Sequence, residues 1–321
     1  MALRQNKVDE AVRLIQSKTD SGDLRAAVLH VRQGKEVVTR AFGAAKTPDA
    51  VFLLASISKP MTSSAVMLLV DRGKVALADP VKKHIPELQH DAILVRHLLT
   101  HTSGLPDMLP ENEALRKRHA PLKDFVAATC KTPLLFAPGT QIRYQSMGIL
   151  LAAEIVERVS GRPLPDFLHD EIYGPLGMKA TSMGLGGRPI ASTMQCQVDD
   201  PSDWDWNSPY WRNLASPWGG AHAPAADIAR FMEYFVKPDP PVLKPATAAS
   251  MIVDQTGLKP GWGLGWMLMR GGFGHSGSTG TLAWLDPKKD LSFVLLTTRP
   301  SAVSAKMVLN PAADLIGQAA E

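Results

Sequence analysis

Patterns typical of β-strands lie near both ends of this 321-residue chain, and helical patterns fill its middle. Near the N-terminus, the apolar runs at 26–31 and 37–42 flank a polar turn, which predicts a β-hairpin. In the last third, the apolar runs at 263–269, 281–286 and 291–298 predict three more strands. A strand buries its apolar face by joining a sheet. We therefore expect one sheet that draws its strands from both ends of the chain.

Apolar residues at helical spacing predict helices before, between and after these strands. They cover residues 8–17, 61–71, 148–159, 225–235 and 311–319. Gly161 suits the end of the third helix as a C-cap, and no internal repeat or low-complexity linker divides the chain. The sequence thus predicts one domain, residues 1–321, of the α/β (α+β) class. We expect its antiparallel sheet to be formed from both termini (about 1–55 and 236–321) and flanked by helices, with a mostly helical region (about 56–235) inserted.

Charged residues are scattered along the chain, although the net charge is +4. The densest basic stretch, residues 116–119, lies next to Glu111 and Glu113 and is typical of a solvated face. Nucleic-acid binding needs a basic patch or stripe, and none is visible. We expect no nucleic-acid partner.

The two cysteines, Cys130 and Cys196, show no CxxC or Cys/His spacing. This excludes a disulfide framework and indicates two buried thiols in a reducing compartment, with a single bridge left open. The N-terminus lacks the apolar core of a signal peptide, and no run approaches the roughly 20 apolar residues of a membrane span. Provided that no leader has been removed, we expect a cytoplasmic protein that makes no membrane contact.

The tetrad Ser56-Ile57-Ser58-Lys59 offers a nucleophile and a base one helical turn apart. A serine hydroxyl attacks poorly until a neighbouring group takes its proton. At a helix start, Ser56 and Lys59 lie on the same face, and the helix N-terminus favours the developing anion. Burial or a neighbouring cation can leave the lysine neutral and able to act as the base. The motif is short enough to occur by chance, so its weight depends on other motifs in the chain.

Two further segments give the tetrad that weight. Tyr144 lies in a loop, residues 138–146, directly before the helix at 148, and His275 lies in the segment 274–278, before the strand at 281. In this order the segments resemble the three catalytic motifs of the serine β-lactamase-like superfamily, which includes class C β-lactamases, DD-peptidases and family VIII-type carboxylesterases. Similar loops occur at 98–106, 175–178, 219–220 and 263–266. The resemblance runs from about residue 25 to 300 and implies a β-lactamase/transpeptidase-like fold.

The resemblance also implies a serine hydrolase that forms an acyl-enzyme on Ser56. Lys59 and Tyr144 share the proton of Ser56, and Tyr144 returns it to the leaving group and later activates water. The backbone N–H groups of Ser56 and Ser278 form the oxyanion hole. His275 holds a substrate carboxylate or tunes Tyr144, with a titration near neutral pH. The substrate-binding residues are Ser146, Ser276 and Gly277. No metal or organic cofactor is implied, and the partner is a small-molecule ester or amide.

Two departures from the superfamily's motifs bear on the substrate. The Tyr-x-Asn motif is Tyr144-Gln145-Ser146 here, and His275 stands where many relatives have lysine or another histidine. Serine reaches less far than the asparagine amide that orients an acylamide side chain. Both changes disfavour cephalosporin hydrolysis and leave ester cleavage untouched, because an ester has an easier leaving group. We predict a carboxylesterase-like hydrolase of small esters, with a β-lactamase or D-amino-acid peptidase as the alternative.

Other interpretations of the same residues remain open. A non-catalytic scaffold of the same fold is disfavoured because the nucleophile, the lysine and the tyrosine are all present. The aromatic segment 204–211 either packs on the sheet or walls a substrate pocket.

The remaining motifs point to structure rather than to cofactor binding. Residues 272–277 match GxGxxG, but no helix pattern follows, which disfavours nucleotide binding. His97 and His101 lack a third metal ligand, so we expect structural hydrogen bonds there. His222 could equally edge the cleft or lie in the core.

Overall fold

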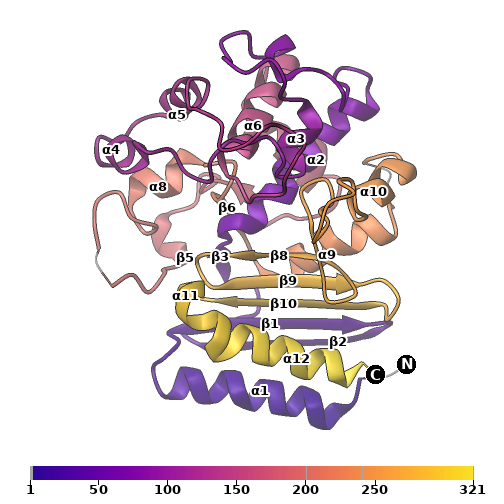
Figure 1. Cartoon of the computed structure of the whole chain (residues 1–321). Coiled ribbons are helices and arrows are strands. Elements are labelled where there is room, and N and C mark those ends of the chain that lie inside the picture. The colour runs from indigo at the N-terminus through magenta and orange to yellow at the C-terminus, as the bar shows by residue number, and fades with distance from the viewer. Residues whose placement is uncertain (1–2, 200, 240–241, 321) are drawn as a thin grey trace.

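The structure is a computed structural model and describes residues 3–199, 201–239 and 242–320 (Figure 1). Six strands form one antiparallel sheet in the order β2-β1-β10-β9-β8-β7. Their bounds are β1 Ala26–Gln33, β2 Glu36–Gly43, β7 Met267–Met269, β8 Gly272–Gly277, β9 Thr281–Asp286 and β10 Leu291–Thr297. Strand β1 pairs with β10, with Val28 opposite Leu296. The predicted antiparallel sheet built from both ends of the chain is therefore confirmed.

Helices cover both faces of this sheet, because its central strands are apolar on both sides. All seven residues of β10 are buried. On one face lie α1 (Gln5–Asp20) and α12 (Asn310–Ala319), which pack against each other and bury Ile15, Leu295 and Ile316 in a shared cluster (Figure 1). On the other face, α9 (Ala225–Val236) contacts β1, β9 and β10.

The inserted region is mainly helical, as predicted. Its longest helices, α2 (Ser58–Asp71) and α6 (Met147–Ser160), pack against each other. Gly161 ends α6 in the left-handed conformation, with φ of +70°, and its N–H donates to the Glu157 carbonyl at 2.8 Å. The shorter helices and turns that complete the chain are η1 Ala55–Ile57, η2 Val81–Lys83, α3 Val95–Leu99, α4 Asn112–Lys117, α5 Leu122–Thr129, α7 Leu164–Leu168, η3 His169–Tyr173, η4 Ile190–Ser192, α8 Pro209–Leu214, α10 Pro245–Met251, α11 Ser301–Ser304 and η5 Ala305–Leu309.

The strand prediction for residues 263–269 is partly wrong. Only Met267–Met269 forms a strand there; the residues before it form a loop in which Gly265, with φ of +88°, packs against Ser63 of α2. Strand β8, in contrast, was not predicted, because glycine is depleted in strands. Its glycines are needed for close packing: a Cβ at Gly274 would lie 2.3 Å from the Ala283 carbonyl oxygen of the neighbouring strand.

A second, small sheet was also not predicted; three of its strands lie in the inserted region and one lies directly before it. Its strand order is β4-β6-β3-β5, and β3 pairs parallel with β5. The bounds are β3 Val51–Leu53, β4 Ser182–Met183, β5 Thr193–Met194 and β6 Ala221–Ala223. Strands of two or three residues are too short to show a periodic pattern, so tertiary contacts alone define them.

One buried cluster joins the large sheet to the helical region. It contains Val28 and Val294 from the sheet together with Phe125 and Leu150 from the inserted helices. The single-domain organisation remains a prediction, which this shared core supports. Within the described ranges, no helix is long and apolar enough to cross a membrane.

Candidate active site

Ser56 lies in a tight turn between β3 and α2. Ala55, directly before it, has φ of +48°, a left-handed conformation that is uncommon outside glycine and that clusters at functional sites. The Ser58 hydroxyl donates to the Ala55 carbonyl at 2.7 Å and accepts from the Ala221 N–H at 2.9 Å. These bonds fix the turn to β6 and leave the Ser56 side chain half-buried.

The same turn is tied to the large sheet from its other side. Thr279 and Thr281 donate through their hydroxyls to the carbonyls of Leu53 and Leu54, at 2.7 and 2.8 Å. A Cβ at Gly277 would lie 2.2 Å from the Leu54 carbonyl oxygen. The glycine of the third motif therefore allows β8 to approach the turn that carries the nucleophile.

Lys59 meets Ser56 one helical turn later, as the spacing predicted. Its side chain is fully buried, and its Nζ lies 3.0 Å from Ser56 Oγ and 3.0 Å from the Trp218 carbonyl oxygen. Burial lowers the pKa of Lys59 to about 7, against a smaller opposing effect of the Asp107 carboxylate. Above that pH the amine is mostly neutral and can accept a proton.

Tyr144 lies beside both residues. Lys59 Nζ is 4.7 Å from the centre of the Tyr144 ring. Burial raises the pKa of the Tyr144 hydroxyl, and a hydrogen bond to Ser56 acts in the opposite direction. The phenol therefore stays protonated at neutral pH. Ser56, Lys59 and Tyr144, predicted from two separate motifs, are thus brought together.

His275 lies next to these three residues, but its protonation state differs from the prediction. Its side chain is 1% exposed, and its ring centre is 6.0 Å from that of Tyr144. Burial, followed by the charge of Lys59, lowers the pKa of His275 to about 3. The predicted titration near neutral pH is therefore wrong, because burial disfavours the charged imidazolium. A neutral imidazole also cannot form an ion pair with a substrate carboxylate.

A cavity of about 310 Å³ opens onto Ser56. Of the residues predicted from the motifs, its lining includes Ser56, Tyr144, Ser146 and Ser278. No described backbone carbonyl accepts from the Ser278 N–H, which lies in the turn after β8. The remaining lining residues are Leu53, Ala55, Asp107, Met108, Asn112, Arg116, Trp206, Trp211, Trp218, Gly219 and Thr279. Ser276 and Gly277 are not among them, so the structure does not support their predicted contact with substrate.

The lining of the cavity shows which part of the aromatic segment 204–211 walls a pocket. Trp206 and Trp211 of that segment line the cavity, together with Trp218. Trp204 instead stacks on Arg116, 4.9 Å from the ring centre to the guanidinium carbon. Part of the segment therefore walls the cavity, and part of it packs.

Three histidines outside the third motif, His97, His101 and His222, have structural roles. His101 Nδ1 accepts from the Gln145 N–H at 3.0 Å, and His97 Nδ1 accepts from the Leu94 N–H at 3.1 Å. His222 is buried in β6, where its ring bonds the Gly220 carbonyl at 2.9 Å, so it belongs to the core. No group of three metal-ligating side chains occurs in the part of the chain that the structure describes.

Gln145, the middle residue of the second motif, holds the Tyr144 loop in place. Its amide nitrogen donates to the His97 carbonyl at 2.9 Å, and its amide oxygen accepts from the Ser103 hydroxyl. Gln145 is fully buried. The amide thus joins the Tyr144 loop to the segment that follows α3.

Asp107 is a cavity residue that the sequence did not reveal. Ser146 Oγ donates to Asp107 Oδ1 at 2.6 Å, and the Ser146 N–H donates to the Asp107 carbonyl at 3.2 Å. The Asp107 carboxylate raises the pKa of both Lys59 and Tyr144. Its position directly after the loop 98–106 was the one signal that could have indicated it.

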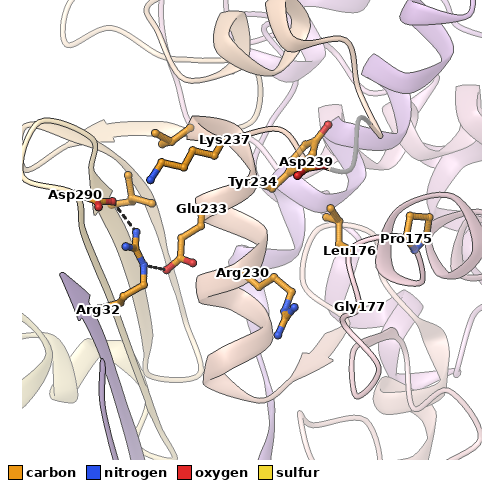
Figure 2. A pocket seen from close by; sticks show the side chains of 12 residues that line it. Arg32, Pro175, Leu176, Gly177, Arg230, Glu233, Tyr234, Lys237, Asp239 and Asp290 are labelled. Atoms are coloured by element: carbon orange, nitrogen blue, oxygen red, sulfur yellow. Dashed lines mark hydrogen bonds and ion pairs between the residues drawn. The ribbon is translucent and has the colours of Figure 1, made fainter. Parts of the chain in front are cut away.

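A larger hollow of about 520 Å³ lies elsewhere, beside α9 (Figure 2). Figure 2 shows Arg32 between two carboxylates, with Nε 2.5 Å from Glu233 and Nη2 2.9 Å from Asp290. Pro175, Leu176 and Gly177 line this hollow, but no residue of the three catalytic motifs does. We therefore do not assign the active site to this hollow, although its volume is larger than that of the cavity at Ser56.

The β-lactamase family model matches residues 11–318 of the chain. The chain belongs to the β-lactamase family. Esterase EstB of Burkholderia gladioli is 27% identical over an alignment that covers 92% of this chain and 87% of that protein. Penicillin-binding protein 4 of Amycolatopsis lactamdurans is 31% identical, with 81% of this chain and 72% of that protein covered.

Solved structures agree with this assignment at the level of the fold. The hydrolase EstCE1, described as having promiscuous acyltransferase activity, superimposes with a TM-score of 0.81 at 21% identity, covering 97% of this chain and 99% of its own. The predicted β-lactamase/transpeptidase-like fold is confirmed. The chain is a serine hydrolase of this family.

Proposed function

We propose that this enzyme hydrolyses small esters through an acyl-enzyme on Ser56, with Lys59 as the base. The observation that carries the proposal is the 3.0 Å distance between Lys59 Nζ and Ser56 Oγ, combined with a lysine pKa of about 7. A catalytic base works best when its pKa lies near the operating pH. Lys59 takes the hydroxyl proton as Ser56 Oγ bonds to the ester carbonyl carbon.

The remaining steps are assigned to Tyr144 and to backbone N–H groups. The protonated Tyr144 donates to the departing alkoxide and recovers its proton through Lys59. A water molecule then attacks the acyl carbon while the neutral Lys59 takes one of its protons, relayed by the Tyr144 hydroxyl. The bond from the acyl carbon to Ser56 Oγ breaks, Lys59 returns the proton to Oγ, and the carboxylic acid leaves. The N–H groups of Ser56 and Ser278 stabilise the oxyanion; the Ser278 N–H, free of a described carbonyl partner, supports this role.

Three features support an ester rather than a β-lactam as substrate. Ser146 Oγ already donates to Asp107, so it is not free to orient an amide side chain. The neutral His275 offers no positive charge to a substrate carboxylate. Tryptophans wall the cavity, which suits an apolar acyl or alcohol group. Esterase EstB is a relative over nearly the whole chain.

Hydrolysis of p-nitrophenyl butanoate by the wild-type protein and by Ser56→Ala tests this proposal. We expect the Ser56→Ala variant to lose at least about 1,000-fold in kcat, since removal of a nucleophile removes the covalent route. Ser17→Ala is the matched control, because Ser17 is an exposed serine on α1. Equal turnover by Ser56→Ala and wild type would refute the assignment.

A second function, β-lactam or D-amino-acid peptide hydrolysis, is favoured by the similarity to penicillin-binding protein 4. Nitrocefin and a D-Ala-D-Ala peptide, supplied to the same two proteins, separate it from the first. Turnover of either that depends on Ser56 and exceeds ester turnover would replace the ester assignment.

The cellular setting also belongs to this proposal. We infer a cytoplasmic location, which is supported by Cys130 and Cys196, both of which are buried and free. That the enzyme binds no nucleic acid remains a prediction from the scattered charges.

A further inference from the structure

Asp107 is the carboxylate that faces the catalytic residues. It lines the cavity beside Ser56, Tyr144 and Ser146. The Ser146 hydroxyl, 2.6 Å away, fixes its orientation. Among the described cations, none forms an ion pair with Asp107, in contrast to Asp124, which is paired with Arg118 at 2.8 Å. The cavity therefore presents a fixed and unneutralised negative charge near the nucleophile.

Arg116 is the one guanidinium among the described residues of the cavity wall, and it interacts with the aromatic segment 204–211. Arg116 is held between Trp204 and Trp211, with its guanidinium carbon 4.1 Å from the Trp211 ring centre. It donates to the Trp204 carbonyl at 2.8 Å, and its electrostatic neighbours are Tyr210 and Asp205 of the same outer segment. Asp107, in contrast, acts on Lys59 and Tyr144 directly. A group attached close to the scissile ester thus meets the charge of Asp107 before that of Arg116.

We propose that Asp107, oriented by Ser146, binds an ammonium group of the substrate, so that the enzyme prefers short esters that carry a positive charge. This rests on the proposed ester hydrolysis at Ser56. A protonated amine satisfies the free oxygen of the carboxylate with a charge-assisted hydrogen bond, and a quaternary ammonium group contacts the carboxylate through its charge alone. A substrate carboxylate is repelled by Asp107 and finds no compensating charge on the neutral His275.

Two pairs of esters of matched shape test the proposal, one for each side of the scissile bond. Benzyl 3-aminopropanoate is compared with benzyl butanoate, which replaces the ammonium with a methyl group on the acyl side. Butanoylcholine is compared with 3,3-dimethylbutyl butanoate, which replaces the quaternary nitrogen with carbon on the alcohol side. The measured quantity is the ratio of kcat/KM between charged and neutral ester, at one pH and low ionic strength. The ammonium group also raises the intrinsic reactivity of the ester, and this effect is the same in every protein variant. The change of the ratio between wild type and Asp107→Asn therefore isolates recognition from chemistry.

For the wild type we expect the charged member of at least one pair to be favoured about fivefold, the scale of one charge-assisted contact at an exposed site. In Asp107→Asn, which keeps the shape and a hydrogen-bonding partner for Ser146, we expect the ratio to fall to near one. Asp107→Glu, which keeps the charge, should retain a preference. Asp91→Asn is the matched control, because Asp91 is an exposed carboxylate paired with Lys82 far from the motif residues, and it should leave the ratio unchanged.

Each contrary result is distinct. A wild type with no preference in either pair, or a preference that persists in Asp107→Asn, overturns the role of Asp107 while ester hydrolysis stands. If Asp107→Glu loses the preference as Asp107→Asn does, the preference depends on the loop conformation and not on the carboxylate charge. That result also overturns the role of Asp107. If wild type hydrolyses none of the four esters, the proposed function itself fails.

Discussion

Replacing Lys59 with methionine should stabilise the protein at neutral pH while it abolishes activity. Lys59 is fully buried, and its pKa falls from 10.5 to about 7 on folding. Between these values the unfolded chain binds a proton that the folded protein does not, so the free energy of unfolding rises with pH across this window. Below pH 7 both states bind the proton, so the folded protein carries the full free-energy cost of burying a charged lysine. Methionine is close to lysine in shape and carries no charge, which removes the penalty.

The magnitude follows from the two pKa values. The lysine costs about 4 kcal/mol of folding free energy at pH 7 and about 2 kcal/mol at pH 9. Lys59→Met removes this cost, but it also removes the hydrogen bonds to the Trp218 carbonyl and to Ser56 Oγ. The loss of these two bonds lowers the stability of the variant by about 1–3 kcal/mol in total, by a similar amount at every pH. The stability difference between Lys59→Met and wild type should therefore shrink by about 2 kcal/mol from pH 7 to pH 9.

The other titratable groups that face Lys59 do not change charge in this window. Burial keeps His101 and His275 neutral, with pKa values far below 7, and keeps Tyr144 protonated. The pH dependence of the difference therefore reports on Lys59.

Urea denaturation of both proteins at pH 7, 8 and 9 measures the difference directly. Lys74→Met is the control, since Lys74 is exposed and its replacement should give a difference that does not depend on pH. A Lys59→Met difference that stays constant over this range would refute the lowered lysine pKa, and with it the role of Lys59 as a base.

Three further predictions concern activity and packing. The kcat/KM for ester hydrolysis should rise with pH through about 7 as Lys59 loses its proton and should show no limb from His275, whose pKa is about 3; a pH–rate profile checks this. Gly277→Ala should lower the free energy of unfolding by about 1–3 kcal/mol and reduce kcat, because the new methyl group meets the Leu54 carbonyl beside the nucleophile; thermal unfolding measures it. Gln145→Ala should cost about 2 kcal/mol or more in urea denaturation, because it leaves buried partners unpaired.

Local patterns were sufficient to predict much of the large sheet and the long helices. Strand β9 was predicted with the observed bounds, and α6 within one residue, because an apolar run and a glycine C-cap are local signals. The distance between Ser56 and Lys59 was predictable for the same reason, since helical spacing fixes it. Bringing Tyr144 to them needed the resemblance of three motifs rather than any local rule.

What the sequence did not reveal depends on contacts between distant segments. Strand β8 is hidden by glycines whose purpose is to allow neighbouring backbones to approach, as at Gly277. The neutral state of His275 follows from its burial, which no local pattern shows. Asp107 became visible only when its bond to Ser146, 39 residues further along the chain, placed it in the cavity.

Mass spectrometry of the protein during turnover tests the central claim most directly. A slowly hydrolysed ester such as p-nitrophenyl pivalate is mixed with enzyme, the reaction is quenched in acid, and the peptides are analysed. We predict an added pivaloyl group on the peptide that contains Ser56, absent from Ser56→Ala and unchanged in Ser17→Ala. Ester turnover with no acyl group on Ser56, or with the acyl group on another residue, would contradict the account.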